Sequence, residues 1–399
     1  MDAPGGVLLT GATGFLGMEV LARYLERTDR DVYALVRAAS ARQAHERIDS
    51  TLRTLFGDGR AYTGRVKAVP GDIESDGLGL DPSLREQLAG KVTDIVHAAA
   101  SVSFSLPLEQ SRRINVAGTR RLLEFAHRCQ QRGGLRRFSY ISTAYVAGTH
   151  VGQFREDQLE VGQDFRNPYE RSKFEAERLV RSHGDRLPIQ VFRPSIIVGE
   201  RRTGWTAAFN VLYAPLKAFS RGAYPVVPAR RSAPVDVVPV DYVADAVFEL
   251  ASRPVQRGGD ETYHLVAGPR ATTVGRLIEL SARYFKRPSP RVFPPGLYRR
   301  VIHPVVVRLG SPRARRGLRK GEIYFPYFSM RISYDDRHAR SCLEPEGISV
   351  TPVEQYFDTL ADFAVKTRWG KAGLTRAQAS SRSPAPPPAR AQAPALSAD

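Results

Sequence analysis

The fold of this chain is decided by the stretch Val7-Leu8-Leu9-Thr10-Gly11-Ala12-Thr13-Gly14-Phe15-Leu16-Gly17. An apolar run ends there in three glycines spaced three apart, and an amphipathic helical pattern covers residues 18–27 directly afterwards. This order predicts a strand, a tight turn and the N-terminus of a helix. Gly11 permits the turn, Gly14 lets a pyrophosphate approach the backbone, and Gly17 lets the helix pack closely on the strand. Because the free N–H groups and positive dipole end of a helix attract phosphate, the stretch predicts dinucleotide binding.

The composition is otherwise that of an ordinary globular protein. The 399 residues are 42% hydrophobic and 25% charged, which provides for a sizeable core. The two cysteines, Cys129 and Cys342, exclude a disulfide framework, and neither has a neighbour at metal-ligand spacing. The sequence shows neither a signal-peptide pattern nor an uncharged apolar run of membrane-spanning length. We therefore expect a cytoplasmic protein without a metal site.

The net charge of +18 is unusually high, and one segment carries much of it. No acidic residue occurs between Glu279 and Glu322, whereas the same segment contains Arg283, Lys286, Arg287, Arg291, Arg299, Arg300, Arg308, Arg313, Arg315, Arg316, Arg319 and Lys320. Such a basic segment is typical of contact with nucleic acid, an anionic membrane or an acidic or phosphorylated substrate carrier, and it also occurs as plain solvated surface. No nucleic-acid-binding motif accompanies the charge, so we expect no nucleic-acid partner. Peripheral membrane contact and carrier contact through the basic segment, residues 283–320, both remain open.

Strands and helices alternate regularly up to Pro194. Strand patterns cover residues 31–36, 66–69, 93–98, 137–142 and 189–192, and helical patterns cover residues 41–56, 113–129 and 168–181. Strands that alternate with helices of this length predict βαβ units. The fold class is therefore α/β, with a doubly wound parallel sheet covered by helices on both faces.

Beyond Pro194 the alternation loosens. Helical patterns cover residues 206–219, 242–252, 273–285 and 353–367, and extended patterns cover 235–239 and 262–266. We expect residues 1–200 to form the dinucleotide-binding domain, with its sheet extending to about residue 265, and residues 201–372 to form a smaller C-terminal substrate-binding lobe. Residues 373–399 are rich in Ala, Pro and Ser and offer little apolar surface, so they are predicted to be a disordered tail.

A tyrosine and a lysine stand one turn apart in the helix predicted over residues 168–181. The stretch Asn167-Pro168-Tyr169-Glu170-Arg171-Ser172-Lys173 opens this helix and places Tyr169 and Lys173 on the same face. A cation held beside a phenol lowers the phenol pKa, which makes the tyrosine a usable proton donor and acceptor near neutral pH. The spacing alone also occurs in surface pairs. Its place after the glycine loop and the fifth strand favours a catalytic role.

The glycine loop and the Tyr-x-x-x-Lys helix together resemble the extended short-chain dehydrogenase/reductases, which have the Rossmann fold. In that superfamily a Ser or Thr at the end of the fifth strand polarises the substrate carbonyl. Thr143 is at the matching position here, with Ser142 one residue earlier as the alternative. The resemblance therefore implies a catalytic set of Thr143, Tyr169 and Lys173.

The resemblance also implies where the cofactor binds. The expected cofactor-binding residues are Gly11, Thr13, Gly14, Phe15, Leu16, Gly17, Arg37, Arg47, Asp72, Ile73, Ala98, Ala99, Asn115, Tyr169, Lys173, Pro194 and Ile196. An acidic residue at the end of the second strand would bind the ribose 2′-hydroxyl and repel a 2′-phosphate. Arg37 stands there instead, with Arg47 on the next helix, so the expected cofactor is NADPH.

Within the superfamily, the chain is most similar to the thioester reductase and fatty acyl-CoA reductase ("male sterility") branch. The similarity lies in residues 10–17, 35–37, 142–146 and 236–241. It implies NADPH-dependent reduction of a fatty or polyketide-like acyl thioester, carried on CoA or an acyl carrier protein, to an aldehyde or alcohol. Nucleotide-sugar dehydratases of this fold carry Asp-Glu after the catalytic Thr, whereas Ala144-Tyr145 stands there here, which argues against dehydration.

Two alternative functions remain at this point. One is a reductase or dehydrogenase of a ketone or secondary alcohol, similar to dihydroflavonol reductases or hydroxysteroid dehydrogenases. The other is a cofactor-binding protein without turnover, which the intact set of Thr143, Tyr169 and Lys173 disfavours.

Overall fold

A parallel β-sheet forms the centre of the computed structural model, which describes residues 5–209, 211–222, 226–255, 258, 261–298, 300, 303–304, 308 and 324–381. All seven strands of the sheet run parallel, in the order β12-β7-β5-β4-β1-β2-β3. The strands are β1 (Gly6–Thr10), β2 (Val32–Val36), β3 (Val66–Pro70), β4 (Val92–His97), β5 (Arg137–Ile141), β7 (Ile189–Pro194) and β12 (Glu261–Leu265). The α/β fold class predicted from the sequence is confirmed.

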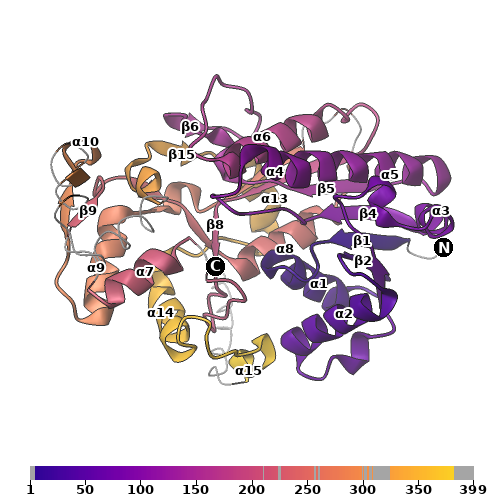
Figure 1. Cartoon of the computed structure of the whole chain (residues 1–399), viewed down its shortest axis with the longest axis horizontal. Helices are drawn as coiled ribbons and strands as arrows, with labels where there is room; N and C mark the ends of the chain where they lie inside the picture. The colour runs from indigo at the N-terminus through magenta and orange to yellow at the C-terminus, as the bar shows by residue number, and fades with distance from the viewer. Residues whose placement is uncertain are drawn as a thin grey trace, which may run out of the picture.

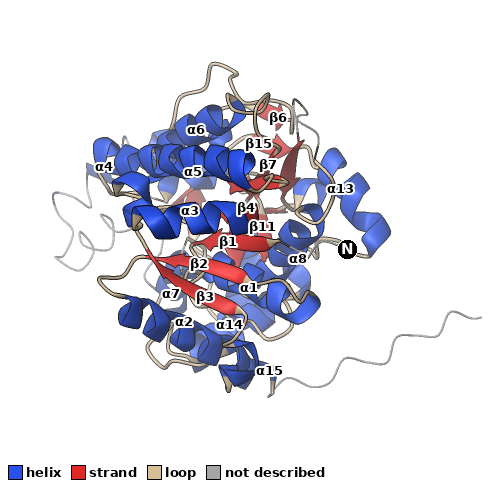
Figure 2. Cartoon of the chain, turned by 90° about the vertical axis from the view of Figure 1, so that its right-hand side faces the viewer, coloured by secondary structure: helices blue, strands red, loops and turns tan. Residues whose placement is uncertain are grey.

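Helices cover both faces of the sheet (Figure 2). The helices α1 (Phe15–Arg27), α2 (Ala41–Phe56) and α8 (Val240–Leu250) pack on one face around Leu21, Leu52 and Val247. On the other face lie α3 (Pro82–Lys91), α5 (Gly118–Arg132) and α6 (Pro168–Arg181). The chain runs outward from β1 to β3 and then returns to β4 on the other side of β1. This reversal leaves a crevice beyond the carboxyl ends of β1 and β4, where open α/β sheets bind ligands.

Two helices differ most from their predicted bounds. The helix expected over residues 113–129 is preceded by α4 (Leu108–Arg112) and by a π-helical turn, η3 (Arg113–Ala117), before α5 begins. The helix expected over 206–219 is shorter, because only α7 (Tyr213–Ser220) forms. Thr206 explains part of the difference, since its Oγ1 accepts the N–H of Ala208 at 3.1 Å and so stabilises a local turn in place of a helix.

The smaller lobe lies at the carboxyl end of the sheet (Figure 1). It is built from α7, α9 (Val274–Phe285), α10 (Pro295–Leu297), η7 (Phe325–Ser329), η9 (Val353–Gln355) and α14 (Phe357–Lys366). Four short strand pairs complete it: β8 (Ile196–Val198) with β11 (Val237–Pro239), β9 (Val226–Pro228) with β14 (Arg291–Phe293), β10 (Pro234–Val235) with β13 (Thr272–Thr273), and β6 (Gly152–Phe154) with β15 (Ile332–Tyr334). The chain then returns to the main sheet, where α13 (Arg337–Leu343) packs on β12 and α8.

The prediction of disorder from residue 373 onward starts too early in the sequence. Thr375 caps a short helix, α15 (Arg376–Ser380), which packs on α2. The backbone carbonyl of Leu374 accepts the indole N–H of Trp205 at 3.0 Å. Arg376 forms ion pairs with Glu19 and Glu26, each at 3.2 Å. Polar contacts, together with the packing of Leu374 and Ala379 on the core, therefore dock residues 374–380, and residues 382–399 of the predicted tail lie outside the described residues.

None of the helices in the described ranges combines the length and the apolar character that a membrane span needs.

Candidate active site

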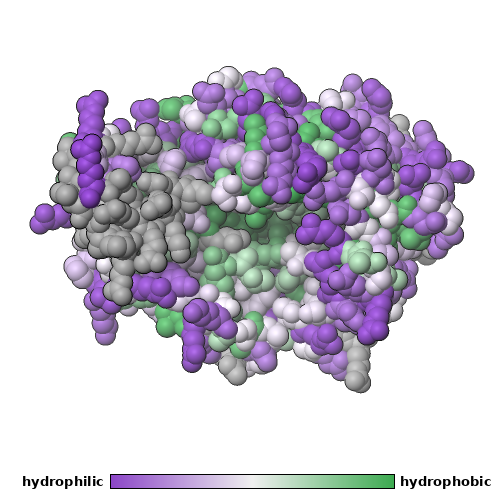
Figure 3. All heavy atoms as spheres, viewed as in Figure 1, coloured by the Kyte–Doolittle hydropathy of each residue, from purple (hydrophilic) through white to green (hydrophobic). Residues whose placement is uncertain are grey.

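A deep cleft separates the glycine loop from helix α6 at the carboxyl edge of the sheet. Its volume is about 1840 Å³ with the open mouth included. Figure 3 shows the hollowed and largely apolar middle of the corresponding face. Of the residues predicted from the sequence, those that line the cleft are Gly11, Gly14, Phe15, Leu16, Gly17, Ala98, Thr143, Tyr169, Lys173, Pro194 and Ile196. The cleft therefore joins the predicted phosphate-binding loop to the predicted catalytic side chains.

The glycine loop is built so that side chains would obstruct it. Gly11 has a positive φ of 77°, and a Cβ atom on it would lie 2.8 Å from the backbone of Ala98. A Cβ atom on Gly17 would lie 2.0 Å from the carbonyl oxygen of Gly11, so a glycine is required where α1 packs against the turn. Helix α1 begins at Phe15, three residues before the amphipathic pattern, with Gly14 as an N-cap that has no capping side chain. The first N–H groups of α1 therefore have no capping side chain and can donate hydrogen bonds to a ligand.

Lys173 is buried beneath the cleft. Its Nζ donates hydrogen bonds to the Tyr140 hydroxyl and the Ile141 carbonyl oxygen, both at 2.7 Å. Burial lowers the pKa of Lys173 to about 7, and the nearby Glu177 carboxylate opposes this change. The lysine therefore faces strand β5 in the structure as it stands.

Tyr169 and Thr143 meet from two different elements, α6 and the end of β5. Burial raises the pKa of Tyr169 to about 12, and its hydrogen bond with Thr143 opposes the rise. The expectation that Lys173 lowers the phenol pKa is wrong for this structure, because desolvation dominates and the lysine is engaged with Tyr140. A tyrosine with this pKa keeps its proton at neutral pH and can donate it.

The alternative hydroxyl, Ser142, is occupied elsewhere. Its Oγ donates to the Glu177 carboxylate at 2.5 Å. Glu177 forms an ion pair with Arg193 at 2.6 Å, and neither side chain is exposed. Burial raises the pKa of Glu177, but Arg193 and Arg181 outweigh burial and hold it below its ordinary value. This buried pair, which sequence reasoning missed, fixes the ends of β5 and β7 next to Thr143.

Two further residues connect the elements around the cleft. Asn115, in the π-helical turn, accepts the Ser101 N–H at 2.8 Å and donates to the Ser172 hydroxyl at 2.9 Å. It therefore ties the loop after β4 to helix α6. His97 is buried between the hydroxyls of Thr10 and Thr119, at 2.8 and 3.0 Å. Burial, with a contribution from Lys173, lowers the pKa of His97 to about 3, so this imidazole is neutral and structural.

The remaining predicted cofactor residues lie outside the wall of the cleft. They are Thr13, Arg37, Arg47, Asp72, Ile73 and Ala99, together with Asn115. Arg47 donates to the backbone carbonyl of Arg37 and, at 3.4 Å, to the Thr13 hydroxyl, so both guanidinium-bearing residues stand next to the glycine loop. Ile73 covers Gly118 on α5, where a Cβ atom would approach it to 3.0 Å.

One acidic residue near these arginines escaped the sequence analysis. Glu74 lies 3.7 Å from Arg37 and 3.1 Å from Arg113. It directly follows Asp72 and Ile73, and the Asp72 carboxylate accepts its N–H at 2.9 Å. Arg37 and Arg113 thus bring positive charge from two segments to the surroundings of the cleft, and the Glu74 carboxylate pairs with both.

Sequence reasoning also missed an aromatic cluster on the substrate side. The Phe104 ring lies 5.6 Å from the rings of both Tyr169 and Tyr327. The Tyr327 hydroxyl donates at 2.6 Å to the carboxylate of Glu170, which is 157 residues away in the chain. No local pattern predicts such a contact.

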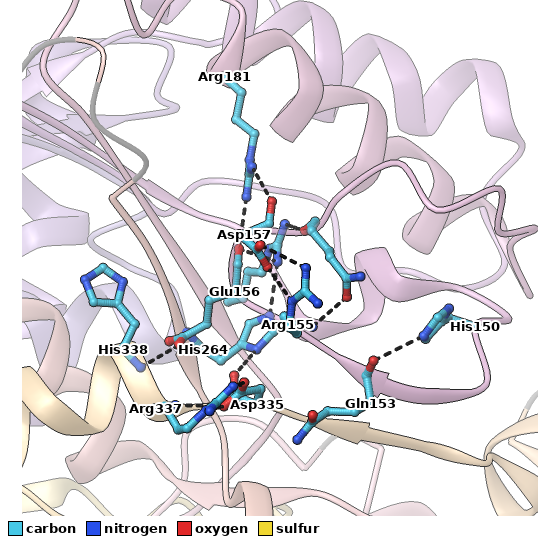
Figure 4. A network of polar contacts seen from close by, with 12 residues as sticks. His150, Gln153, Arg155, Glu156, Asp157, Arg181, His264, Asp335, Arg337 and His338 are labelled. Atoms are coloured by element: carbon cyan, nitrogen blue, oxygen red, sulfur yellow. Dashed lines mark hydrogen bonds and ion pairs between the residues drawn. The ribbon is translucent and has the colours of Figure 1, made fainter.

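A second polar network surrounds His264 on β12 (Figure 4). The Glu156 carboxylate accepts backbone N–H groups from His264, His338 and Ala339, at 2.7–2.9 Å. The Nδ1–H of His264 also donates to the Asp335 carbonyl oxygen at 2.6 Å. This network fastens the returning C-terminal chain to the edge of the main sheet.

Comparison with known proteins agrees with this geometry. Residues 9–247 match the family model described as Male sterility protein. The nonribosomal peptide synthetase asaC of Aspergillus flavus is 32% identical over 276 residues, which cover 66% of this chain and 26% of that protein. Probable fatty acyl-CoA reductase 5 of Arabidopsis thaliana is 26% identical over 351 residues, which cover 70% of each protein. The chain spans about a quarter of the length of the first curated relatives it matches.

A solved structure resembles the whole described fold. The terminal R domain from the myxalamid PKS-NRPS biosynthetic pathway has a TM-score of 0.79 and 28% identity, and the match covers 94% of each chain. The match to the family model covers more than half of the chain. We conclude that the chain belongs to the male sterility family of NAD(P)H-dependent oxidoreductases, within the extended short-chain dehydrogenase/reductases.

Proposed function

We propose that this chain reduces an acyl thioester, using a hydride from NADPH, and releases an aldehyde and a free thiol. The observation that carries the proposal is the single cleft in which the glycine loop faces Thr143, Tyr169 and Lys173. The relatives named as a nonribosomal peptide synthetase and a fatty acyl-CoA reductase support thioester substrates.

The side chains of the cleft suit the addition step. The bound nicotinamide supplies the hydride that adds to the thioester carbonyl carbon. Thr143 and Tyr169 hydrogen-bond the carbonyl oxygen as negative charge develops on it. Tyr169, whose pKa is about 12, donates its proton to that oxygen and forms a hemithioacetal.

The second step breaks the carbon–sulfur bond. The hydroxyl oxygen of the hemithioacetal becomes the aldehyde oxygen, and its proton leaves with the thiolate sulfur as a free thiol. Tyr169 takes up a proton from solvent before the next turnover, and Lys173 holds the end of β5 through the Ile141 carbonyl oxygen. A second round of hydride transfer to the aldehyde would give the alcohol.

The proposed cofactor preference rests on the two arginines beside the glycine loop. Arg37 is 72% exposed and Arg47 donates to its carbonyl oxygen, so both can reach a ribose 2′-phosphate. We expect Arg37→Asp to lower kcat/KM for NADPH about 10- to 150-fold relative to NADH, as follows from losing one charged contact. Arg42→Asp is the matched control, because Arg42 lies on α2, the helix that carries Arg47, and its side chain is 89% exposed. An unchanged preference in Arg37→Asp would refute the NADPH assignment.

The proposed carriers are CoA and acyl carrier protein, both of which are anionic. Of the basic segment 283–320, Arg313, Arg315 and Arg316 lie outside the described residues. Neutralising these three together is expected to raise KM for carrier-bound substrate and to leave KM for NADPH unchanged. The KM for carrier-bound substrate should then also depend less on salt concentration. Equal effects on CoA, carrier and a short phosphate-free thioester would refute recruitment by charge.

The function itself is tested by NADPH consumption against a panel of acyl-CoAs, acyl carrier proteins, ketones and nucleotide sugars. We expect oxidation of NADPH with thioesters, matched by release of one thiol per aldehyde formed. Tyr169→Phe serves as the inactive control. Turnover of ketones without any thiol release from thioesters would overturn the proposal in favour of a ketone reductase.

A further inference from the structure

The smaller lobe encloses a second cavity that adjoins the catalytic cleft. Its volume is about 1160 Å³ with the open mouth included. The two cavities share five wall residues, Tyr145, Ile196, Val211, Tyr324 and Tyr327. Tyr145 follows Thr143 by two positions, so the shared wall begins at the reacting centre.

The lobe is packed in a way that leaves this cavity in its middle. Its apolar side chains form four small clusters instead of one core, and all four contribute to the cavity wall through residues such as Tyr334, Ile196, Leu216 and Val274. Protein interiors normally fill such space, because apolar side chains that face a void lose dispersion contacts. An apolar cavity that adjoins the cleft is therefore expected to hold an apolar ligand.

The wall offers little to a charged or strongly polar ligand. Asp236 is the one charged residue among the described residues of the wall, and its carboxylate accepts the N–H groups of Ala267 at 2.7 Å and Gly268 at 2.9 Å. The Tyr334 hydroxyl is buried and has no hydrogen-bond partner within the described ranges. The cavity wall is thus predominantly apolar, and a charged acyl group would be desolvated there without a counter-charge.

Three helices contribute residues to the cavity wall that do not line the cleft. Leu216 on α7, Leu277 and Ser281 on α9, and Phe357 on α14 line the cavity but not the cleft. Ser281 is the small residue of this group, is 6% exposed, and donates its hydroxyl to the Leu277 carbonyl oxygen at 2.7 Å. A larger side chain at this position would occupy part of the cavity.

We propose that this cavity binds the acyl chain of the thioester, a predominantly apolar chain with at most an oxygen substituent, and that Ser281 and its neighbours set the longest chain accepted. The inference rests on the proposed thioester reduction. The thioester carbonyl lies at Thr143 and Tyr169, and the chain runs past Tyr145 toward Phe357.

The first test is a series of saturated acyl-CoAs from C2 to C16. Each added methylene is expected to raise kcat/KM about fourfold until the chain reaches the end of the cavity, after which the values level off or fall. Ser281→Leu is expected to lower kcat/KM at least tenfold for the longest chain accepted and to leave butyryl-CoA within twofold. Ser252→Leu is the matched control, because Ser252 also donates to a helix carbonyl but is exposed.

The second test measures binding without turnover, by the fluorescence of cis-parinaric acid, a C18 fatty acid. Ser281→Leu is expected to weaken its binding at least fivefold, whereas Ser252→Leu binds like the wild type. If Ser281→Leu does not fold, Leu277→Ala takes its place and is expected to shift the preferred acyl-CoA to a longer chain.

The outcomes separate the two proposals. Reduction of thioesters with no dependence on chain length, or an equal effect of Ser281→Leu on all chains, would overturn the cavity assignment and leave the reductase intact. Binding of the fatty acid that responds to Ser281→Leu, without reduction of any thioester, would support the cavity and overturn the proposed reaction.

Discussion

Lys173 is expected to destabilise the folded chain in the absence of cofactor, and the size of this effect can be worked out. Burial lowers its pKa from 10.5 to about 7. At low pH this difference corresponds to about 5 kcal/mol of lost stability, since one pKa unit is about 1.4 kcal/mol. Replacement by methionine keeps the volume and removes the cation. We therefore expect Lys173→Met to unfold at a higher urea concentration than the wild type at pH 6.

The pH dependence gives the sharper measurement. Below pH 7 the amine is protonated in both the folded and the unfolded chain, and the full cost of burying the cation is present. Between pH 7 and pH 10.5 the folded chain binds fewer protons, so the free energy of unfolding of the wild type rises with pH. The stability advantage of Lys173→Met should therefore shrink by about 2–3 kcal/mol between pH 6 and pH 9.

The assay is urea unfolding of the cofactor-free protein at pH 6, 7, 8 and 9. The methionine variant also loses the hydrogen bonds to Tyr140 and Ile141, which lowers its stability by about 1 kcal/mol each without changing the slope. Lys91→Met, at an exposed helix end, is the control and should show no such trend. A stability difference between Lys173→Met and the wild type that stays constant with pH would refute the reasoning.

Three further predictions follow from the contacts described above. Tyr169→Phe should lower kcat by a factor of about 10²–10⁴ and leave the Kd for NADPH unchanged, since the proton matters in the transition state; steady-state kinetics and cofactor titration check both values. Truncation after residue 372 should lower the free energy of unfolding by at least about 2 kcal/mol, because it removes Arg376 from the buried Glu19, whereas a chain ending at residue 381 should match the full-length protein in thermal unfolding. Tyr334→Phe should raise the free energy of unfolding by about 1 kcal/mol, because it deletes an unpartnered buried hydroxyl, and a lower Tm in calorimetry would contradict this.

The truncation experiment reverses what the sequence suggests about the C-terminal segment. Residues 373–399 contain little apolar surface, which predicts that their removal costs nothing. Arg376 and the Leu374 carbonyl make polar contacts to α1 and to Trp205, and such contacts leave no trace in hydropathy. Composition reports the average tendency of a segment, whereas a few directed contacts can dock part of it.

The sequence by itself determined the elements whose signals are local. The glycine spacing predicts β1, the turn and α1, because the positive φ of Gly11 and the approach of Gly14 and Gly17 to the Gly11 carbonyl oxygen all lie within ten residues. The helix over residues 168–181 is found with the predicted bounds, since Asn167 caps it and Pro168 occupies its first turn. The spacing of Tyr169 and Lys173 then follows from helix geometry alone.

Only the tertiary structure decided which partners these side chains meet. Lys173 lies one turn from Tyr169, yet it bonds to Tyr140 on β5, and desolvation rather than the lysine dominates the pKa of Tyr169. The contact of Tyr327 with Glu170 and the apolar cavity behind Tyr145 join segments more than a hundred residues apart. Burial and long-range packing depend on how whole elements come together, and for that reason no local pattern in the sequence encodes them.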